Sequence, residues 1–239
     1  MPANLGTESV TVQHPLTNYA TKAGWTPVAT ETALTLRRGE SGLFFYELLK
    51  RKLQELNPGL INGESADEVI HRLESVRNNI EGNSEILAWL RGERTIYIES
   101  EKRHRNITLI AFGDPARNEF HVTEEWQYTN GTKTNRADVI FLINGIPVAV
   151  VETKSARKHN AMEEALVQLR RYHNETPEMV TSSQVFDFSH IIEFFYGVTW
   201  NLDRKNIFAW KHHEKANYEA KVTAFFAPLR ILEMIKEWI

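Results

Sequence analysis

Residues 136–156, "RADVIFLINGIPVAVVETKSA", decide the fold, because they predict two apolar strands joined by a tight turn at Asn144-Gly145. Asp138, Glu152 and Lys154 interrupt these apolar strands. A charged side chain inside a sheet core is costly unless another group compensates it. The three polar residues therefore indicate either a functional site or a surface hairpin whose charged strand ends are solvated.

The register of this hairpin determines whether the two acids meet. A regular two-residue turn at Asn144-Gly145 would set Asp138 opposite Val151, which places the acids on opposite faces. A shift of one residue sets Asp138 opposite Glu152, and Lys154 then lies on the same face because side chains alternate along a strand. We therefore predict a three-residue loop or a β-bulge here.

Two converging carboxylates repel each other, and burial makes their ionisation costlier. Mg²⁺ removes both costs, since it takes oxygen ligands and keeps several waters. Asp138 and Glu152 are thus candidate Mg²⁺ ligands. Lys154 is a candidate for positioning or deprotonating a water, or for offsetting charge on a phosphate. These groups are suited to phosphodiester hydrolysis.

The segments before the hairpin change from a helical to a strand period. Residues 1–92 are predicted to be mainly helical, with a capping box at Ser65 and Glu68 and a helix end at Gly82. The predicted helices span 9–22, 43–59, 65–82 and 84–91. The predicted strands, which form an antiparallel meander, span 94–100, 106–112, 119–128, 137–143 and 147–154.

The segments after the hairpin predict a helix over 161–175, strand-like runs over 191–200 and 206–210, and a final helix over 228–239. The spacing of that helix puts Leu229, Leu232, Ile235 and Ile239 on one face, which we expect to pack on this domain. The expected fold is α/β, with a mixed, centrally antiparallel sheet flanked by helices and a helical N-terminal region. We expect one domain over 1–239, with the core at 93–200 and a C-terminal segment at 201–239.

The helix over 161–175 carries further candidate residues. Gln168 and Tyr172 are four residues apart, so they share a face that could reach the acidic hairpin. Basic residues on and before this helix are candidate DNA-phosphate contacts, unless they only form a solvated helix face: Arg157, Lys158, Arg170 and Arg171.

The composition excludes several classes of protein. The 239 residues carry a net charge of −3, so the chain does not hold nucleic acid by bulk positive charge. There is no cysteine, which excludes disulfides and thiolate metal sites and suits a cytoplasmic setting. No apolar run approaches the length of a membrane-spanning helix, so we expect no membrane partner.

Taken together, these residues resemble the PD-(D/E)XK nuclease superfamily. More narrowly, they are similar to the N-terminal nuclease region of the restriction (motor) subunit of type I restriction enzymes. Asp138 matches the motif aspartate, Glu152-Thr153-Lys154 match the (D/E)XK triplet, and Gln168 with Tyr172 matches the QxxxY motif. The resemblance also includes "AGW", "LNPGL", "GDPARNEFHV", "INGIPVAVVETK" and "FAWKHH", which together span most of the chain.

The resemblance implies a type I site-specific deoxyribonuclease that uses Mg²⁺, with DNA and the methylation and specificity subunits as partners of the full-length protein. ATP-driven translocation is expected outside these residues, since no G-x-x-x-x-G-K-[ST] motif occurs. The family's additional metal-binding acid points to Glu8, whereas Ala111 replaces an acid found in many members. The alternatives are another PD-(D/E)XK nuclease and a catalytically idle module that docks DNA or subunits.

Overall fold

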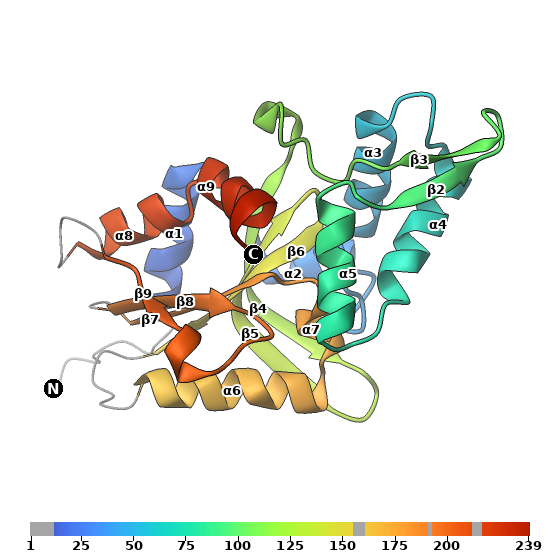
Figure 1. Cartoon of the computed structure of the whole chain (residues 1–239). Helices are drawn as coiled ribbons and strands as arrows, with labels where there is room; N and C mark the ends of the chain where they lie inside the picture. The colour runs from blue at the N-terminus through green and yellow to red at the C-terminus, as the bar shows by residue number, and fades with distance from the viewer. Residues whose placement is uncertain (1–11, 155–160, 191–192, 212–216) are drawn as a thin grey trace, which may run out of the picture.

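A computed structural model describes residues 12–154, 161–190, 193–211 and 217–239 of the chain. Within them, a seven-stranded sheet in the order β1-β4-β5-β6-β7-β8-β9 lies between helices on both sides (Figure 1). β1 is parallel to β4 and β6 is parallel to β7, whereas the other neighbouring strands are antiparallel. The expected α/β fold with a mixed, centrally antiparallel sheet is therefore confirmed.

The strands of this sheet are β1 (Thr26–Val28), β4 (Phe120–Thr129), β5 (Thr134–Ile143), β6 (Ile146–Thr153), β7 (Val185–His190), β8 (Glu193–Val198) and β9 (Phe208–Ala209). β6 occupies the middle position and is buried along its whole length. This central position explains why its sequence is apolar on both faces.

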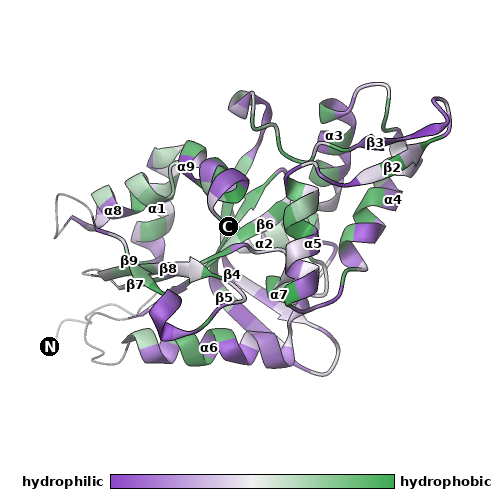
Figure 2. Cartoon of the chain, in the orientation of Figure 1, coloured by the Kyte–Doolittle hydropathy of each residue, from purple (hydrophilic) through white to green (hydrophobic). Residues whose placement is uncertain are grey.

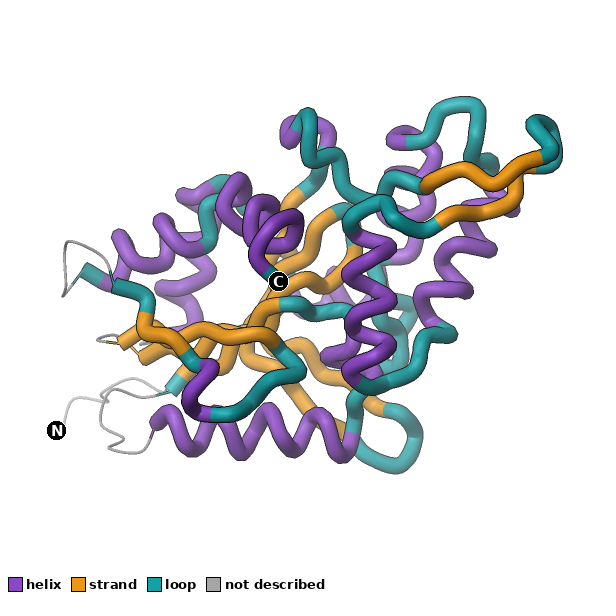
Figure 3. Tube along the Cα trace, viewed as in Figure 1, coloured by secondary structure: helices purple, strands orange, loops and turns teal. Residues whose placement is uncertain are grey.

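The α-helices are α1 (His14–Ala23), α2 (Thr30–Leu36), α3 (Tyr46–Leu56), α4 (Gly63–Glu74), α5 (Ile80–Leu90), α6 (Ala161–Glu175), α7 (Glu178–Thr181), α8 (Tyr218–Phe225) and α9 (Pro228–Glu233). Short 3₁₀ turns occur at η2 (Pro115–Arg117) and η3 (Arg204–Asn206), and α9 continues as a π-helical turn, η4 (Met234–Trp238). Figure 3 shows the strands gathered between these helices. No helix in the described residues is long and apolar enough to cross a membrane.

Two apolar clusters hold the sheet between its helices. On the α6 side, Leu166, Leu169 and Tyr172 pack against alternate strand residues such as Ile140 and Val150. On the other side, α1, α8 and α9 pack on the intervening strand residues. Figure 2 shows the corresponding concentration of hydrophobic residues along the central strands. Each fully buried aliphatic or aromatic side chain contributes roughly 1.5–3 kcal/mol.

The β5–β6 hairpin contains the predicted bulge. Next to the turn, Leu142 pairs with Pro147, whereas farther along Val139 pairs with Val151, and the register shifts between Phe141 and Leu142. The turn itself has two central residues, Asn144 and Gly145, with φ of 52° and 86°, as a tight hairpin turn of type I′ requires. The bulge therefore moves the acidic end of the hairpin by one residue without lengthening the turn.

Buried asparagine amides fix the loops at the turn end of this hairpin. Asn144 donates to the Leu109 carbonyl at 2.8 Å and to Asn118 Oδ1 at 2.9 Å, and it accepts from the Glu119 amide at 2.8 Å. Asn118 in turn bonds both the amide and the carbonyl of Ala111. These side chains replace the backbone partners that a strand would supply.

The predicted five-stranded meander is wrong in its first part. β2 (Thr95–Ile98) and β3 (Arg103–Asn106) form a separate two-stranded ribbon that projects from the body in Figure 1. Residues 107–112 form no strand, because the Asn57 side chain takes the hydrogen bonds of the Thr108 amide and carbonyl. β1, α2, α7, β7 and α8 were not predicted.

Three predictions about helix ends and faces are also wrong. The capping box of α4 joins the N-cap Asn62 to Ser65 at the third helical position, so Ser65 is not the N-cap and Glu68 is not its capping-box partner. Gly82 lies in the first turn of α5, whose N-cap is Asn79, and ends no helix. Leu229 is 65% exposed, because the buried stripe of the last helix is formed by Ile231, Leu232, Met234 and Ile235.

Candidate active site

The central strands bring Asp138, Glu152 and Lys154 together. Continued by one residue, the pairing of Val139 with Val151 sets Asp138 of β5 opposite Glu152 of β6. Glu152 is fully buried, and the side chains of Asp138 and Lys154 are 13% and 8% exposed. The three residues therefore lie inside the sheet, at the end of the hairpin away from the Asn144-Gly145 turn. This burial excludes a surface hairpin whose charged strand ends are solvated.

Short contacts tie the three charged groups to one another. Nζ of Lys154 lies 3.5 Å from Oε2 of Glu152 and 3.9 Å from Oδ2 of Asp138, and it donates to the Thr153 carbonyl at 2.8 Å. Thr153 donates to the same Asp138 oxygen from its main-chain amide at 2.8 Å and its hydroxyl at 3.0 Å. The middle residue of the triplet therefore orients the aspartate carboxylate.

Glu152 holds its proton more strongly than an ordinary glutamate. Burial raises the pKa of Glu152 to about 8, and the neighbouring Asp138 carboxylate adds to the rise, while Lys154 and the Tyr172 hydroxyl oppose it. The single positive charge of Lys154 thus does not offset the rise in the pKa of Glu152 that burial and the Asp138 carboxylate cause. A bound cation would stabilise the ionised form of Glu152.

Gln168 and Tyr172 reach this cluster from α6. The Tyr172 hydroxyl lies 2.7 Å from Oε1 of Glu152 and 2.5 Å from the Arg136 carbonyl, and Gln168 donates to it at 2.6 Å. A phenol has one proton, so it cannot donate to both acceptors at once. When Glu152 is protonated, the carboxyl can donate to Tyr172 and the phenol can donate to Arg136. When Glu152 is ionised, its carboxylate accepts a hydrogen bond that the phenol donates.

The basic residues expected to contact DNA have different positions. Arg170 donates to the Leu202 carbonyl at 3.2 Å, so it ties α6 to the segment before η3. Arg171 is exposed, with its guanidinium 5.8 Å from the centre of the Tyr172 ring. Arg157 and Lys158 lie outside the described residues, as does Glu8.

The donors at this site fit a Mg²⁺ ion. Two carboxylates, Asp138 and Glu152, face the same ammonium group, and Mg²⁺ commonly uses one or two carboxylates and fills its other positions with water and phosphate oxygens. Across the described ranges, no group of three or more histidine or acidic side chains is placed to hold a metal. A site of two protein ligands is therefore the arrangement that these residues offer.

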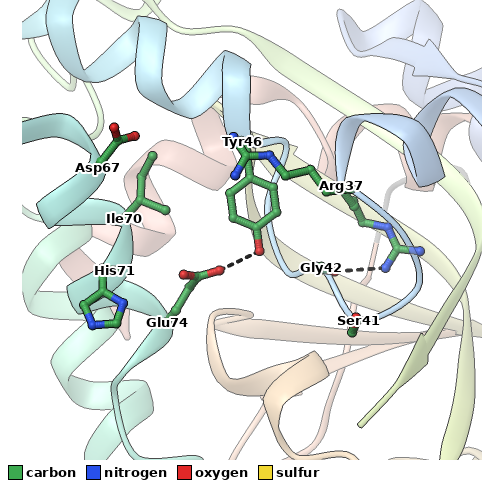
Figure 4. Close-up of a pocket in the computed structure, with 9 residues that line it drawn as sticks. Arg37, Ser41, Gly42, Tyr46, Asp67, Ile70, His71 and Glu74 are labelled. Atoms are coloured by element: carbon green, nitrogen blue, oxygen red, sulfur yellow. Dashed lines mark hydrogen bonds between the residues drawn. The ribbon is translucent and has the colours of Figure 1, made fainter. Parts of the chain in front are cut away.

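A cavity of about 370 Å³ elsewhere in the chain has no residue in common with this cluster. It lies between the segment 37–46 and α4, and Figure 4 shows its lining. The Tyr46 hydroxyl donates to Glu74 at 2.6 Å, and Arg37 donates to the Gly42 carbonyl at 3.2 Å (Figure 4). Because Asp138, Glu152 and Lys154 do not line it, this cavity is not the candidate site.

The structure adds two residues that sequence patterns did not identify. Thr153 holds the Asp138 carboxylate, and Gln13 of the α1 N-terminus donates to the Asp138 carbonyl at 3.1 Å. Thr153 lies between two motif residues, so its position was a usable signal. Gln13 is 125 residues from Asp138 in the chain, and no local pattern connects them.

Comparison with known proteins gives the same family as the motifs. The sequence model of the family described as "Type I restriction enzyme R protein N terminus" matches residues 6–204. Over 157 residues, the chain is 30% identical to the putative type I restriction enzyme MjaVIIP endonuclease subunit of Methanocaldococcus jannaschii. That alignment covers 62% of this chain and 14% of the relative.

Two further relatives carry similar names. The putative type I restriction enzyme MjaIXP endonuclease subunit of the same organism is 27% identical over 169 residues, which cover 67% of this chain and 16% of the relative. The type I restriction enzyme EcoprrI endonuclease subunit of Escherichia coli is 32% identical over 80 residues, which cover 34% of this chain and 25% of the relative. The chain thus spans a small part of the length of these proteins.

Proposed function

We propose a nuclease function for this chain, because the chain belongs to the family of type I restriction enzyme R protein N termini and carries a buried pair of carboxylates beside a lysine. The proposed reaction is Mg²⁺-dependent hydrolysis of DNA phosphodiesters by a PD-(D/E)XK site. The observation that carries the proposal is the convergence of Asp138, Glu152 and Lys154 on the two central strands, which a shifted hairpin register alone makes possible.

Each residue has a role that follows from its contacts. Asp138 and Glu152 would hold Mg²⁺, which when bound polarises the phosphate and lowers the pKa of a coordinated water. Thr153 keeps the Asp138 carboxylate in one orientation. Lys154 keeps a proton at Nζ between the two acids, from where the ammonium offsets negative charge on the phosphate.

Tyr172 and Gln168 support the same site from α6. The phenol supplies a hydrogen bond to Glu152 whenever that carboxyl is ionised, so it favours the form that binds a cation. Gln168 fixes the phenol oxygen through its own amide. We assign both residues to orientation of Glu152 and give neither a direct part in breaking the phosphodiester bond.

The wider setting of the proposal comes from the relatives, whose names describe endonuclease subunits. We propose that the longer protein acts on DNA in the cytoplasm, together with methylation and specificity subunits. ATP is assigned to other parts of such a protein. A catalytically idle docking module is the competing function, and the metal-binding measurement below separates the two.

The test is Mg²⁺-dependent cleavage of plasmid DNA by the 239-residue chain, compared with Glu152→Ala and Lys154→Ala. Matched controls are Glu219→Ala and Lys22→Ala, which break an exposed ion pair of 2.7 Å away from the site. Cleavage by the parent and the controls, but by neither site variant, is the expected result. Cleavage that survives both site substitutions contradicts the proposal. Absence of cleavage together with absence of Mg²⁺ binding favours the docking module.

A further inference from the structure

The sheet is interrupted beside Asp138. Within the described part of β4 and β5, Glu124 pairs with Val139 and Trp126 pairs with Ala137, but the ladder pairs neither Glu125 nor Asp138. Glu125 has a φ of 55°, in the left-handed region that a non-glycine residue rarely adopts. Backbone strain of this kind clusters at functional sites, where surrounding contacts maintain it.

The side chain of Gln13, at the start of α1, bonds to both of the residues that the ladder does not pair, Glu125 and Asp138. Gln13 precedes α1 and is 3% exposed. Its Nε2 lies 3.0 Å from Oε1 of Glu125, 3.1 Å from the Asp138 carbonyl and 3.5 Å from Oε2 of Glu124. Nε2 carries two hydrogens, and the two shorter contacts use both.

The charged side chains next to Gln13 have contacts of their own. His14 lies 2.7 Å from Glu124, so that carboxylate has another contact. Arg136 contacts the second oxygen of Glu125. The Gln13 amide can therefore join Glu125 to the main chain of Asp138.

We propose that Gln13 is a positioning residue for Asp138, a role that rests on the proposed nuclease function. The amide fixes the Asp138 main chain from the α1 side, while Thr153 fixes the carboxylate of the same residue from β6. The position of one Mg²⁺ ligand is thus determined at both ends of the residue. Contacts that orient metal ligands are commonly worth 10- to 100-fold in metal affinity.

The chemistry of the side chain explains why an amide occupies this position. A carboxylate here would add a negative charge next to the carboxylates of Glu124 and Glu125, and a lysine would replace a planar pair of donors with a flexible point charge. Methionine has a similar length without donors, so Gln13→Met removes the two hydrogen bonds and keeps most of the packing.

The test is calorimetric titration of the 239-residue chain with Mg²⁺. The set is the parent, Gln13→Met, Glu152→Ala and the control Gln184→Met. Gln184 is also buried, and its Nε2 donates to the Ser182 and Asn83 carbonyls, away from the acidic cluster. We expect Gln13→Met to weaken Mg²⁺ binding about 10-fold. Gln184→Met should lower stability similarly and leave the affinity unchanged.

Each outcome decides between distinct conclusions. Binding by the parent and equal binding by Gln13→Met overturns the positioning role and leaves the proposed function intact. Absence of binding by the parent overturns both. If Gln13→Met does not fold, Glu125→Ala takes its place, because it keeps Gln13 but removes the acceptor that holds its amide. A weaker affinity in Glu125→Ala supports the role, and an unchanged affinity overturns it.

Discussion

The hydroxyl of Tyr172 lies 2.7 Å from Oε1 of Glu152, so the helix that follows the hairpin is bonded directly to the buried carboxylate. The sequence spacing of Gln168 and Tyr172 predicted that both share a helix face that could reach the acidic hairpin. In the structure, Gln168 donates a hydrogen bond to the Tyr172 hydroxyl, which is itself hydrogen-bonded to Glu152.

The first prediction concerns this phenol. Tyr172→Phe removes the hydrogen bond that favours ionised Glu152, so Mg²⁺ affinity and the rate of cleavage should each fall about 10-fold. Titration calorimetry and plasmid cleavage measure the two effects. Tyr218→Phe is the matched control, because Tyr218 is also a buried phenol, hydrogen-bonded to Ser189 at 3.0 Å. Equal losses in both variants would show that the effect is one of general stability.

The second prediction concerns the pH dependence of stability without metal. The pKa of Glu152 is raised from 4.5 to about 8, so between these values the folded chain retains a proton that the unfolded chain has lost. Rising pH therefore favours unfolding, by up to about 1.4 kcal/mol per pH unit. The stability that the protonated carboxyl provides is present below pH 4.5 and is lost as the pH rises through about 8.

Urea unfolding of the parent and Glu152→Gln in EDTA, from pH 5 to pH 8, measures this effect. The parent should lose stability relative to the variant across this range. The buried Asp187 carboxyl, whose pKa is also raised by burial, is present in both proteins and cancels in the difference. Mg²⁺ should reduce the slope, because the ion favours the ionised carboxylate. Parallel curves in EDTA would contradict the pKa shift.

The third prediction concerns Asn144 in the hairpin turn. Asn144→Ala removes three hydrogen bonds of a buried amide and leaves alanine at a φ of 52°. The expected loss in the free energy of unfolding is about 3 kcal/mol. Asn144→Gly removes the same bonds without the backbone strain, so it should recover about 1 kcal/mol. Chemical denaturation measures both, and an equal loss would exclude the strain contribution.

The fourth prediction separates two neighbouring arginines. Arg171 is exposed and is the candidate phosphate contact, so Arg171→Ala should weaken DNA binding and lower the salt slope of the binding constant by about 0.9. Arg170 bonds the Leu202 carbonyl, so Arg170→Ala should leave the slope unchanged. Fluorescence anisotropy at several salt concentrations measures these slopes. A lower slope for Arg170→Ala with an unchanged slope for Arg171→Ala would assign the phosphate contact to Arg170 instead.

Much of the central sheet could be predicted from sequence, because its signals are local. Alternation and the Asn-Gly turn identified β5 and β6, and the requirement that Asp138 meet Glu152 predicted a three-residue loop or a bulge, of which the structure has the bulge. Residues 161–175 were predicted as a helix with the ends that α6 has. The residues that begin and end these elements, such as the Asn-Gly turn, act through their own backbone preferences and need no distant partner.

The errors occur where a partner distant in the chain decides the local structure. Residues 107–112 have a strand-like sequence, yet Asn57 takes the hydrogen bonds of Thr108. β1 has only three residues and exists because β4 pairs with it. Gln13 has no pattern that distinguishes it from any polar residue at a helix start. Its contact with Asp138 follows from the packing of α1 against β4.

The long separation between Gln13 and Tyr172 has a consequence for the synthesis of the protein. The hairpin with Asp138 and Glu152 can form as soon as residues 134–153 are available, since its contacts are local. The complete cluster also requires a helix made near the beginning of the chain and a helix made after the hairpin. A chain still being translated, and ending before residue 172, therefore holds both acids without the group that bonds Glu152. The candidate site is thus completed only after α6 has been made, so a nascent chain that has formed the hairpin alone does not yet carry the arrangement on which the proposed activity depends.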